Sequence, residues 1–285
     1  MKLREIFYAI GHHLFGHTPK PKQYPFEIRA QLLNGERVQF AQWMHPKAYP
    51  CVISEPMILQ HQEYLKAGDV AIDIGAHSGD STLPVAFAVG PQGSVLAFEA
   101  NRYVFETLQK NAELNPEKTH IIPYNLAIAE KDGDYEFRYN DPGFMNGGNA
   151  ESLKNCRHAG IFRQIVKGVN LFRFLQQNHP DLIARIRFIK IDAEGYDLAI
   201  AESISGLIDA QRPYIQIEVM KGTSVDYRKA LFDFFRSRNY SLNHLGRTGR
   251  LLKEHEDILG NETIDLLCVP PAESGSGRES HPTAA

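Results

Sequence analysis

Two glycines and an aspartate lie together in a short segment between a predicted strand and a predicted helix. Residues Asp73–Asp80 read Asp-Ile-Gly-Ala-His-Ser-Gly-Asp and begin at the end of the predicted strand Val70–Ile74. Glycine lets the backbone turn sharply and approach a ligand without obstruction from a Cβ atom, and the start of a helix offers N–H groups without partners. The segment is therefore predicted to bind a ligand.

The spacing of these glycines distinguishes between two kinds of nucleoside cofactor. Proteins that bind dinucleotides carry Gly-x-Gly-x-x-Gly, with the pyrophosphate on the helix N-terminus. This segment lacks the first Gly-x-Gly pair and has Asp-x-Gly-x-x-x-Gly, which is typical of methyltransferases that use S-adenosyl-L-methionine. We predict this cofactor, with contacts from Asp73, Gly75, Ala76, His77 and Gly79.

The ends of the next two predicted strands add cofactor contacts. Glu99 ends the predicted strand Ser94–Glu99, where its carboxylate can accept hydrogen bonds from both ribose hydroxyls; a solvated strand-end carboxylate is the alternative. Asn125 and Ala127, at the end of the predicted strand His120–Leu126, fall where the adenine ring would lie. Small residues there admit a flat ring, although an ordinary strand end explains either residue nearly as well.

Three carboxylates are the candidate catalytic residues. Asp192 and Glu218 end the predicted strands Phe188–Asp192 and Tyr214–Val219, at the sheet edge where open α/β folds bind ligands. A carboxylate there can accept a proton from an acceptor hydroxyl. Glu194 enters the next predicted helix, where an acid stabilised by the helix dipole is an equal alternative, and Glu218 can likewise be structural. Two carboxylates without a third ligand do not define a metal site, so we assign no metal ligands.

Alternating strands and helices must position these residues. From Val70 onward short apolar strands alternate with helices that begin near Asp80, Tyr103, Asn170, Gly195 and Ser224. This pattern predicts a Rossmann-like α/β three-layer sandwich, with a mostly parallel sheet of about seven strands in the order 3-2-1-4-5-7-6. Pro123 agrees with that order, because proline removes a ladder donor and the third strand is then an edge.

Segments outside this repeating unit have their own signals. Tyr24–Trp43 is predicted to be a hairpin with Asn34-Gly35 in its turn, and Met1–His17 has the apolar stripe of a short helix. Tyr240–Leu245 and Thr263–Val269 are predicted to form a closing antiparallel pair. The long insert Glu130–Lys167, with a strand-like Tyr135–Tyr139, is expected to form a lid or substrate wall.

These signals divide the chain into parts. We expect an N-terminal helix and hairpin extension, a cofactor-binding domain and a disordered tail poor in apolar residues, over residues 1–54, 55–270 and 271–285.

With these motifs in place, the chain resembles the FkbM family of methyltransferases from about Glu55 to Met220. The resemblance rests on the runs Gly68–Ala76, Ala97–Ala100 and Ile189–Gly195, of which the last is the most family-specific. It implies a class I methyltransferase fold and O-methylation of a hydroxyl on a sugar, polyketide or other small molecule. The sequence departs from the family pattern at His77, where Asn is common, and at Ala193, where Val is common.

Composition narrows the partners and the compartment. A formal charge of −3 and a pI near 6.5 provide no broad basic field for nucleic acid, which agrees with the small-molecule or glycan acceptor that the resemblance implies. The three cysteines are far apart, without zinc spacing or disulfide density, which favours buried thiols in a cytoplasmic protein. No segment is long and apolar enough to be an integral membrane span, and a homo-oligomer is compatible with the sequence.

Two other functions stay open at this point. An NAD-dependent oxidoreductase shares the architecture, but the missing Gly-x-Gly pair argues against it. A non-catalytic, cofactor-binding scaffold of the same fold is the second alternative, and the intact set of Asp73, Gly75, Gly79, Glu99 and Asp192 argues against it.

Overall fold

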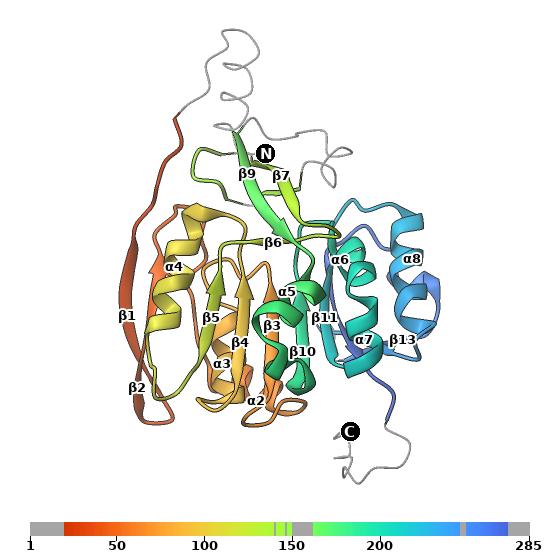
Figure 1. The fold of residues 1–285 in the computed structure, drawn as a ribbon, viewed down its shortest axis with the longest axis horizontal. Helices are drawn as coiled ribbons and strands as arrows, with labels where there is room; N and C mark the ends of the chain where they lie inside the picture. Colours follow the sequence, from red (N-terminus) through yellow and green to blue (C-terminus); the bar gives the residue numbers. More distant parts are fainter. Residues whose placement is uncertain (1–19, 140, 146, 150–161, 246–248, 273–285) are drawn as a thin grey trace, which may run out of the picture.

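The central element of the fold is an eight-stranded sheet (Figure 1). The computed structural model describes residues 20–139, 141–145, 147–149, 162–245 and 249–272. The strand order is β13-β12-β14-β11-β10-β3-β4-β5. The parallel strands are β3 (Val70–Ile74), β4 (Ser94–Phe98), β5 (Ile121–Tyr124), β10 (Ile186–Ile191) and β11 (Tyr214–Val219). The antiparallel strands are β14 (Ile264–Val269), β12 (Ser241–His244) and β13 (Arg250–Leu252).

This arrangement confirms the predicted order and adds an edge strand, β13, which the sequence analysis did not identify. The closing antiparallel pair is β12 and β14, as predicted. Pro123 lies in the edge strand β5. The N–H groups of Val95 in β4 and of Glu99 just after it donate to the carbonyls of His120 and Tyr124. Because alternate residues of a strand bond to opposite neighbours, Pro123 faces the free edge, where its missing N–H breaks no ladder bond.

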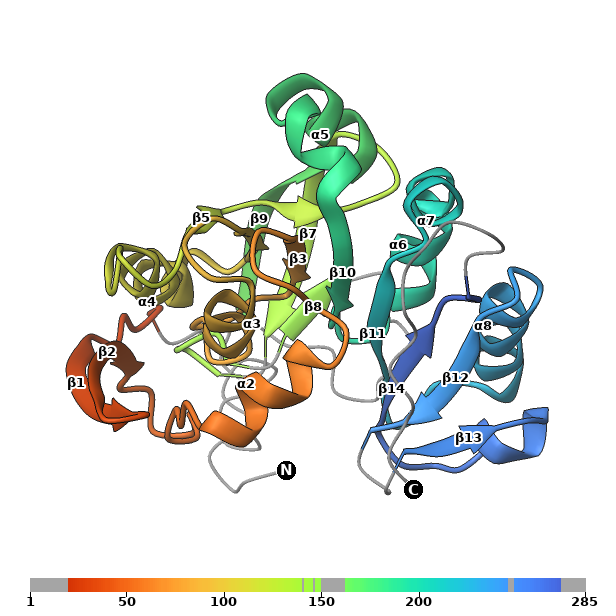
Figure 2. The same cartoon turned by 90° about the horizontal axis from the view of Figure 1, so that it is seen from below.

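Helices cover both faces of the main sheet (Figure 2). The helices on one face are α2 (Glu55–Gln62), α3 (Thr82–Val89) and α4 (Arg102–Glu113). Those on the other are α5 (Leu171–Asn178), α6 (Asp197–Ser203), α7 (Ser205–Gln211) and α8 (Val225–Arg236). Short 3-10 helices span Pro180–Arg185 and His255–Ile258. None of the helices in the described ranges is long and apolar enough to cross a membrane.

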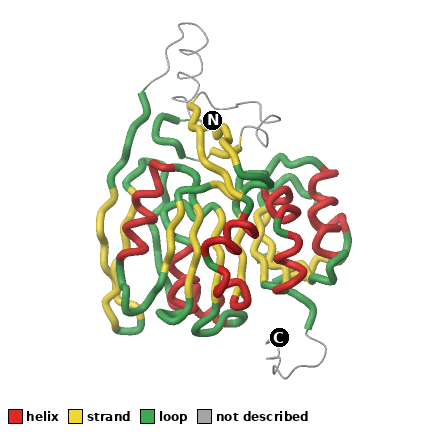
Figure 3. The backbone as a smooth tube through the Cα atoms, in the orientation of Figure 1, coloured by secondary structure: helices red, strands yellow, loops and turns green. Residues whose placement is uncertain are grey.

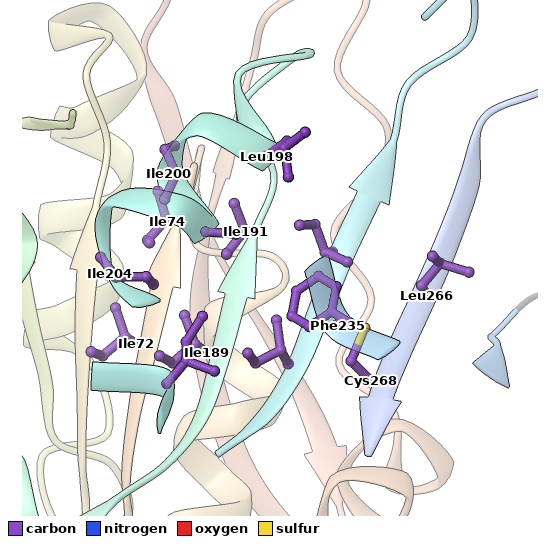
Figure 4. Close-up of a cluster of buried hydrophobic side chains, with 14 of the residues drawn as sticks. Ile72, Ile74, Ile189, Ile191, Leu198, Ile200, Ile204, Phe235, Leu266 and Cys268 are labelled. Atoms are coloured by element: carbon purple, nitrogen blue, oxygen red, sulfur yellow. The ribbon is translucent and has the colours of Figure 1, made fainter. Parts of the chain in front are cut away.

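Isoleucines of adjacent strands form the larger core. Ile72, Ile189 and Ile191 belong to one buried cluster with Ile204, between α6 and α7, and with Phe235 of α8 (Figure 4). Burying one such side chain contributes about 1.5–3 kcal/mol. This core holds the strand ends in a fixed register, and that register places the polar residues that follow them.

The N-terminal hairpin forms as predicted and docks on α4. Strands β1 (Phe26–Leu33) and β2 (Glu36–Trp43) are joined by Asn34 and Gly35, whose φ angles of 52° and 79° belong to the tight turn that Asn-Gly favours. On α4 the amide of Asn111 accepts from the N–H of Ala41 at 2.6 Å and donates to its carbonyl at 3.0 Å. The side-chain amide thus pairs with the strand edge as a further strand would. The predicted helix over Met1–His17 lies outside the described residues.

A second, four-stranded sheet lies over the carboxyl ends of the main sheet (Figure 3). It contains β6 (Ala127–Ile128), β7 (Gly133–Tyr139), β8 (Gly147–Asn149) and β9 (Phe162–Val169). Most of it comes from the long insert, and β7 contains the strand-like stretch seen in the sequence. The sequence analysis did not predict β9. Residues 150–161 of the insert, and the tail from residue 273, lie outside the described part of the chain.

Candidate functional site

A cavity of about 800 Å³ lies where the second sheet meets the carboxyl ends of β3, β4 and β10. Its volume is within the range of roughly 300–1,000 Å³ that is usual for small-molecule sites. The predicted site residues in its wall are Gly75, His77, Glu99, Ala127, Asp192 and Glu194. The predicted residues outside its lining are Asp73, Ala76, Gly79, Asn125 and Glu218.

The turn after β3 depends on the close approach of two backbones. Gly75 donates its N–H to the carbonyl of Phe98 at 2.9 Å, and Asp192 donates its N–H to the carbonyl of Ile74 at 3.0 Å. A Cβ atom on Gly75 would lie 1.9 Å from the Asp192 carbonyl oxygen, and the φ of Gly75 is 81°. Only glycine satisfies both conditions, so Gly75 allows the ends of β3 and β10 to meet at the cavity.

Asp73 supports this turn from below. It is 1% exposed, and its Oδ2 accepts hydrogen bonds from Ser81 at 3.0 Å and from Thr82 at 2.7 Å. These bonds tie the strand to the start of α3. Burial raises the pKa of Asp73, and the ammonium of Lys190, 3.8 Å from Oδ1, opposes that shift.

Glu99 is held at the cavity wall by two backbone N–H groups. Its Oε2 accepts from His77 and its Oε1 accepts from Asn101, each at 2.7 Å. The residue is 9% exposed, and burial raises the pKa of its carboxyl group. Each carboxylate oxygen has a second lone pair, so a fixed Glu99 can still accept two hydrogen bonds from a ligand diol.

His77 occupies the left-handed backbone region, with φ at 49°. Asn and His are both enriched among residues that adopt this conformation, which explains how His77 can stand where the family commonly has Asn. The His77 ring packs edge-on against Trp43, with centroids 5.3 Å apart. Burial lowers the pKa of His77, but neighbouring carboxylates, above all Asp80, raise it by more.

The predicted adenine wall is only partly in the cavity. Leu126, Ala127 and Ile128 line it and present an apolar surface beside Glu99. Asn125 is exposed instead, and its amide donates to the carbonyl of Glu99 at 2.8 Å. Asn125 therefore fixes the end of β4 rather than the cavity surface.

Acidic residues gather on the opposite side of the cavity around Asp192. Burial and the charge of Asp192 raise the pKa of Glu194 to about 7. Burial, Asp192 and Glu194 raise the pKa of Glu218 to about 8. Glu218 lies opposite Asp265 in the β11–β14 ladder, and it is Asp265 that reaches the cavity. A hydroxyl-bearing ligand would meet several carboxyl groups here.

The sequence analysis missed Lys190, the cation in this cluster. Its Nζ lies 2.9 Å from Oδ2 of Asp192, and the residue is 9% exposed. A charged residue inside the apolar run of β10 was the available signal, because lysine is rarely buried without a partner. Tyr139, which lines the cavity from β7 and is 2% exposed, was also missed.

Hydrogen bonds from two side chains fix the insert at the buried Asp141. Asp141 bonds to His45 at 3.3 Å and to Lys47 at 2.9 Å. Although burial acts in the opposite direction, these partners lower the pKa of Asp141 to about 2. Asn101 donates to the carbonyl of Phe144 at 2.7 Å, so the cavity wall is tied to both the hairpin segment and α4.

Within the described residues, no group of three or more His, Cys, Asp or Glu side chains is placed to hold a metal ion.

Together, the strand order, the glycine turn after β3 and the acid after β4 define the class I methyltransferase fold. The Methyltransferase FkbM domain matches residues 73–242. The chain therefore belongs to the FkbM methyltransferase family.

Solved structures provide more distant comparisons. Methyltransferase FkbM from Methylobacillus flagellatus is 14% identical with a TM-score of 0.42, and the match covers 72% of this chain but 44% of that one. Precorrin-6y C5,15-methyltransferase from Geobacter metallireducens is 12% identical with a TM-score of 0.41, over 80% and 95% of the two chains. TYW2 from P. horikoshii, solved with MeSAdo, is 12% identical with a TM-score of 0.40, over 93% and 81%. No curated protein matches the sequence.

The close approach at Gly75 predicts a large effect of a single methyl group. Gly75→Ala adds both left-handed strain and a clash with the Asp192 carbonyl, whereas Gly222→Ala, at a φ of 85° with nothing within 4 Å, adds strain alone. Strain costs about 1–2 kcal/mol, and overpacking adds roughly 1–3 kcal/mol. We expect chemical denaturation to show the larger loss for Gly75→Ala. Equal losses of stability in the two variants would mean that the ends of β3 and β10 can move apart without an energetic cost.

The raised pKa of Glu218 predicts how stability changes with pH. The unfolded side chain ionises near its ordinary value of 4.5, whereas the folded one keeps its proton to about pH 8. As the pH rises between these values the unfolded chain loses its proton first, so stability is lost. Glu218→Gln removes this loss, and its unfolding free energy relative to wild type should rise from about pH 5 to about pH 8. Glu117→Gln, at an exposed residue, is the control. If the difference in unfolding free energy between Glu218→Gln and wild type stayed the same between pH 5 and pH 8, the raised pKa of Glu218 would be contradicted.

Proposed function

We propose that the protein transfers a methyl group from S-adenosyl-L-methionine to a hydroxyl of a small molecule or glycan. The observation that carries this proposal is the pairing, across one cavity, of a fixed diol acceptor and a lysine-bound carboxylate. Glu99 is the diol acceptor, and Asp192, which lies at the end of β10, is the carboxylate. Membership in a methyltransferase family supports it.

The cavity residues fit the cofactor's chemical groups. Glu99 offers two oriented oxygens for the ribose hydroxyls, and Leu126–Ile128 offer an apolar wall for the adenine. At Gly75 the end of β3 lies against the backbone of Asp192, which brings these groups and Asp192 to the same cavity. The amino-acid end would lie along the turn that contains His77.

The cofactor supplies an electrophilic methyl group on a positively charged sulfur, which keeps the electron pair of the broken carbon–sulfur bond. The protein must then hold the acceptor oxygen in line and take up its proton. Asp192 is the candidate proton acceptor, because it lines the cavity and is paired with a cation. Glu194 and Glu218, whose pKa values are raised to about 7 and about 8, are partly or mostly protonated near neutral pH.

The acceptor class follows from the same side of the cavity. Glu194, Asp265 and Gln216 line it beside Asp192, together with the buried Tyr139. Carboxyl, amide and phenol groups are suited to several hydroxyls at once, as on a sugar. This supports a polyhydroxylated acceptor.

Removing Glu99 is predicted to weaken cofactor binding. Glu99→Ala should cost about 1.5–3 kcal/mol of affinity, or roughly ten- to hundredfold, because two charge-assisted hydrogen bonds are lost. Calorimetry with S-adenosylmethionine measures this, with Glu113→Ala on the exposed end of α4 as control. Unchanged affinity, or tighter binding of NAD than of S-adenosylmethionine by the wild-type protein, would overturn the cofactor assignment.

Asp192→Asn is predicted to lower methyl transfer by roughly two to four powers of ten, the usual effect of losing a general base. The assay incubates the protein with methyl-labelled cofactor and a panel of methyl glycosides, and mass spectrometry locates the label. Cofactor affinity and thermal stability should stay near wild type. Near-normal turnover by the variant would remove Asp192 from the mechanism, and cofactor binding without transfer to any oxygen acceptor would favour a scaffold.

A further inference from the structure

We propose that Lys190 is a positioning residue, whose ammonium holds one oxygen of Asp192 so that the other faces the acceptor. This inference rests on the proposed function of Asp192 as proton acceptor. Lys190 itself is not the candidate proton acceptor, because it lines the cavity with only 9% of its surface exposed and its ammonium is already engaged by the carboxylates of Asp192 and Asp73.

The strand register determines where the ammonium lies. Lys190 is in the central strand β10, opposite Asp73 of β3 and opposite Gln216 of β11. Side chains alternate between the faces of a sheet, so residues in register share a face. Lys190 is therefore directed to the same face as Asp73, away from the isoleucine core formed by Ile189 and Ile191.

Distances show which carboxylate receives the direct hydrogen bond. Lys190 Nζ lies 2.9 Å from Asp192 Oδ2 and 3.8 Å from Asp73 Oδ1. Charge-assisted N–H···O bonds are about 2.7–2.9 Å long, so the bond goes to Asp192. Ser81 and Thr82 both donate to Oδ2 of Asp73, and the buried Oδ1 has no hydrogen bond from the described residues but lies 3.8 Å from the ammonium. The direct hydrogen bond of the lysine therefore goes to the cavity residue, while Asp73 supplies a second negative charge beside it.

Asp192 needs such a partner because its side chain is 38% exposed in the cavity wall. A half-exposed carboxylate rotates unless one oxygen is fixed, and a small misplacement of a reacting group is costly in rate. With Oδ2 bound to Lys190, the orientation of Oδ1 is set as well. The ammonium also opposes the combined negative charge of Asp73, Asp192 and Glu194.

The competing explanation is that Lys190 only neutralises the buried Asp73. Two variants separate these roles: Lys190→Met, and the double variant Asp73→Asn with Lys190→Met, which removes both buried charges. If Lys190 positions Asp192, the double variant regains stability in chemical denaturation, but turnover on the best methyl glycoside stays at least about a hundredfold below wild type. Recovery of turnover in the double variant would overturn the proposal.

A split between turnover and cofactor binding adds a readout that a structural role would not move. Loss of the ammonium frees Oδ2 of Asp192, so turnover in Lys190→Met should fall at least about a hundredfold while the affinity for S-adenosylmethionine stays near wild type. Lys190→Arg keeps a charged donor and should restore much of the turnover. The exposed Lys131→Met should leave both quantities unchanged. A loss of cofactor affinity as large as the loss of turnover would contradict the positioning role.

One arm of the test needs no acceptor and so separates this inference from the proposed function. In protein labelled with ¹⁵N-lysine, the buried Lys190 ammonium should give a slowly exchanging signal, assigned by its loss in Lys190→Arg. Asp192→Asn should shift this signal and speed its exchange, while Asp73→Asn should affect it less. A larger effect of Asp73→Asn than of Asp192→Asn on this signal would show that Asp73 holds the lysine. This outcome can be read whether or not methyl transfer is found.

Discussion

The contact between the ends of β3 and β10 is the constraint on which the site depends. The backbone of Gly75 lies so close to the Asp192 carbonyl that no Cβ atom fits between them. The N–H of Asp192 donates to the carbonyl of Ile74, which joins the two strand ends directly. The proposed cofactor-binding turn and the proposed proton acceptor are therefore neighbours by backbone geometry. A side chain at Gly75 would separate the two elements before it affected any ligand contact.

This junction concentrates negative charge, and the fold assigns each acid a different set of partners. Glu99 accepts from two backbone N–H groups, and Asp197 accepts from those of Ala193 at 2.7 Å and Gly195 at 2.9 Å. Both oxygens of these acids are anchored by backbone N–H groups. Asp192 instead has Oδ2 on the side chain of Lys190 and lies in the cavity wall. The hydrogen-bond partners thus separate the acids that the backbone anchors from the proposed proton acceptor, which residue type alone cannot do.

Features carried by a short stretch of sequence predicted the strands and turns of the fold. Contacts between residues far apart in the sequence were not predicted. Pro123 and the Asn34-Gly35 turn each carry their structural meaning in their own sequence, so the edge strand and the hairpin were predictable. Strand β9 was not, because it buries Gln164 and leaves Ile165 63% exposed, which reverses the usual hydrophobic alternation. The pairing of His45 with Asp141 joins residues 96 positions apart, and no spacing rule relates them.

The N-terminal hairpin is part of the site for the same long-range reasons. Trp43, at its end, packs against His77 of the turn after β3, and Asn111 bonds both to the hairpin and, at 2.7 Å, to the carbonyl of Ser78 in that turn. The following residues Lys47–Tyr49 line the cavity. His77 is therefore held by its left-handed backbone, by Glu99 and by an aromatic contact from the hairpin. A side chain that differs from the family pattern is accommodated here because histidine, like asparagine, readily adopts the left-handed backbone conformation of this turn.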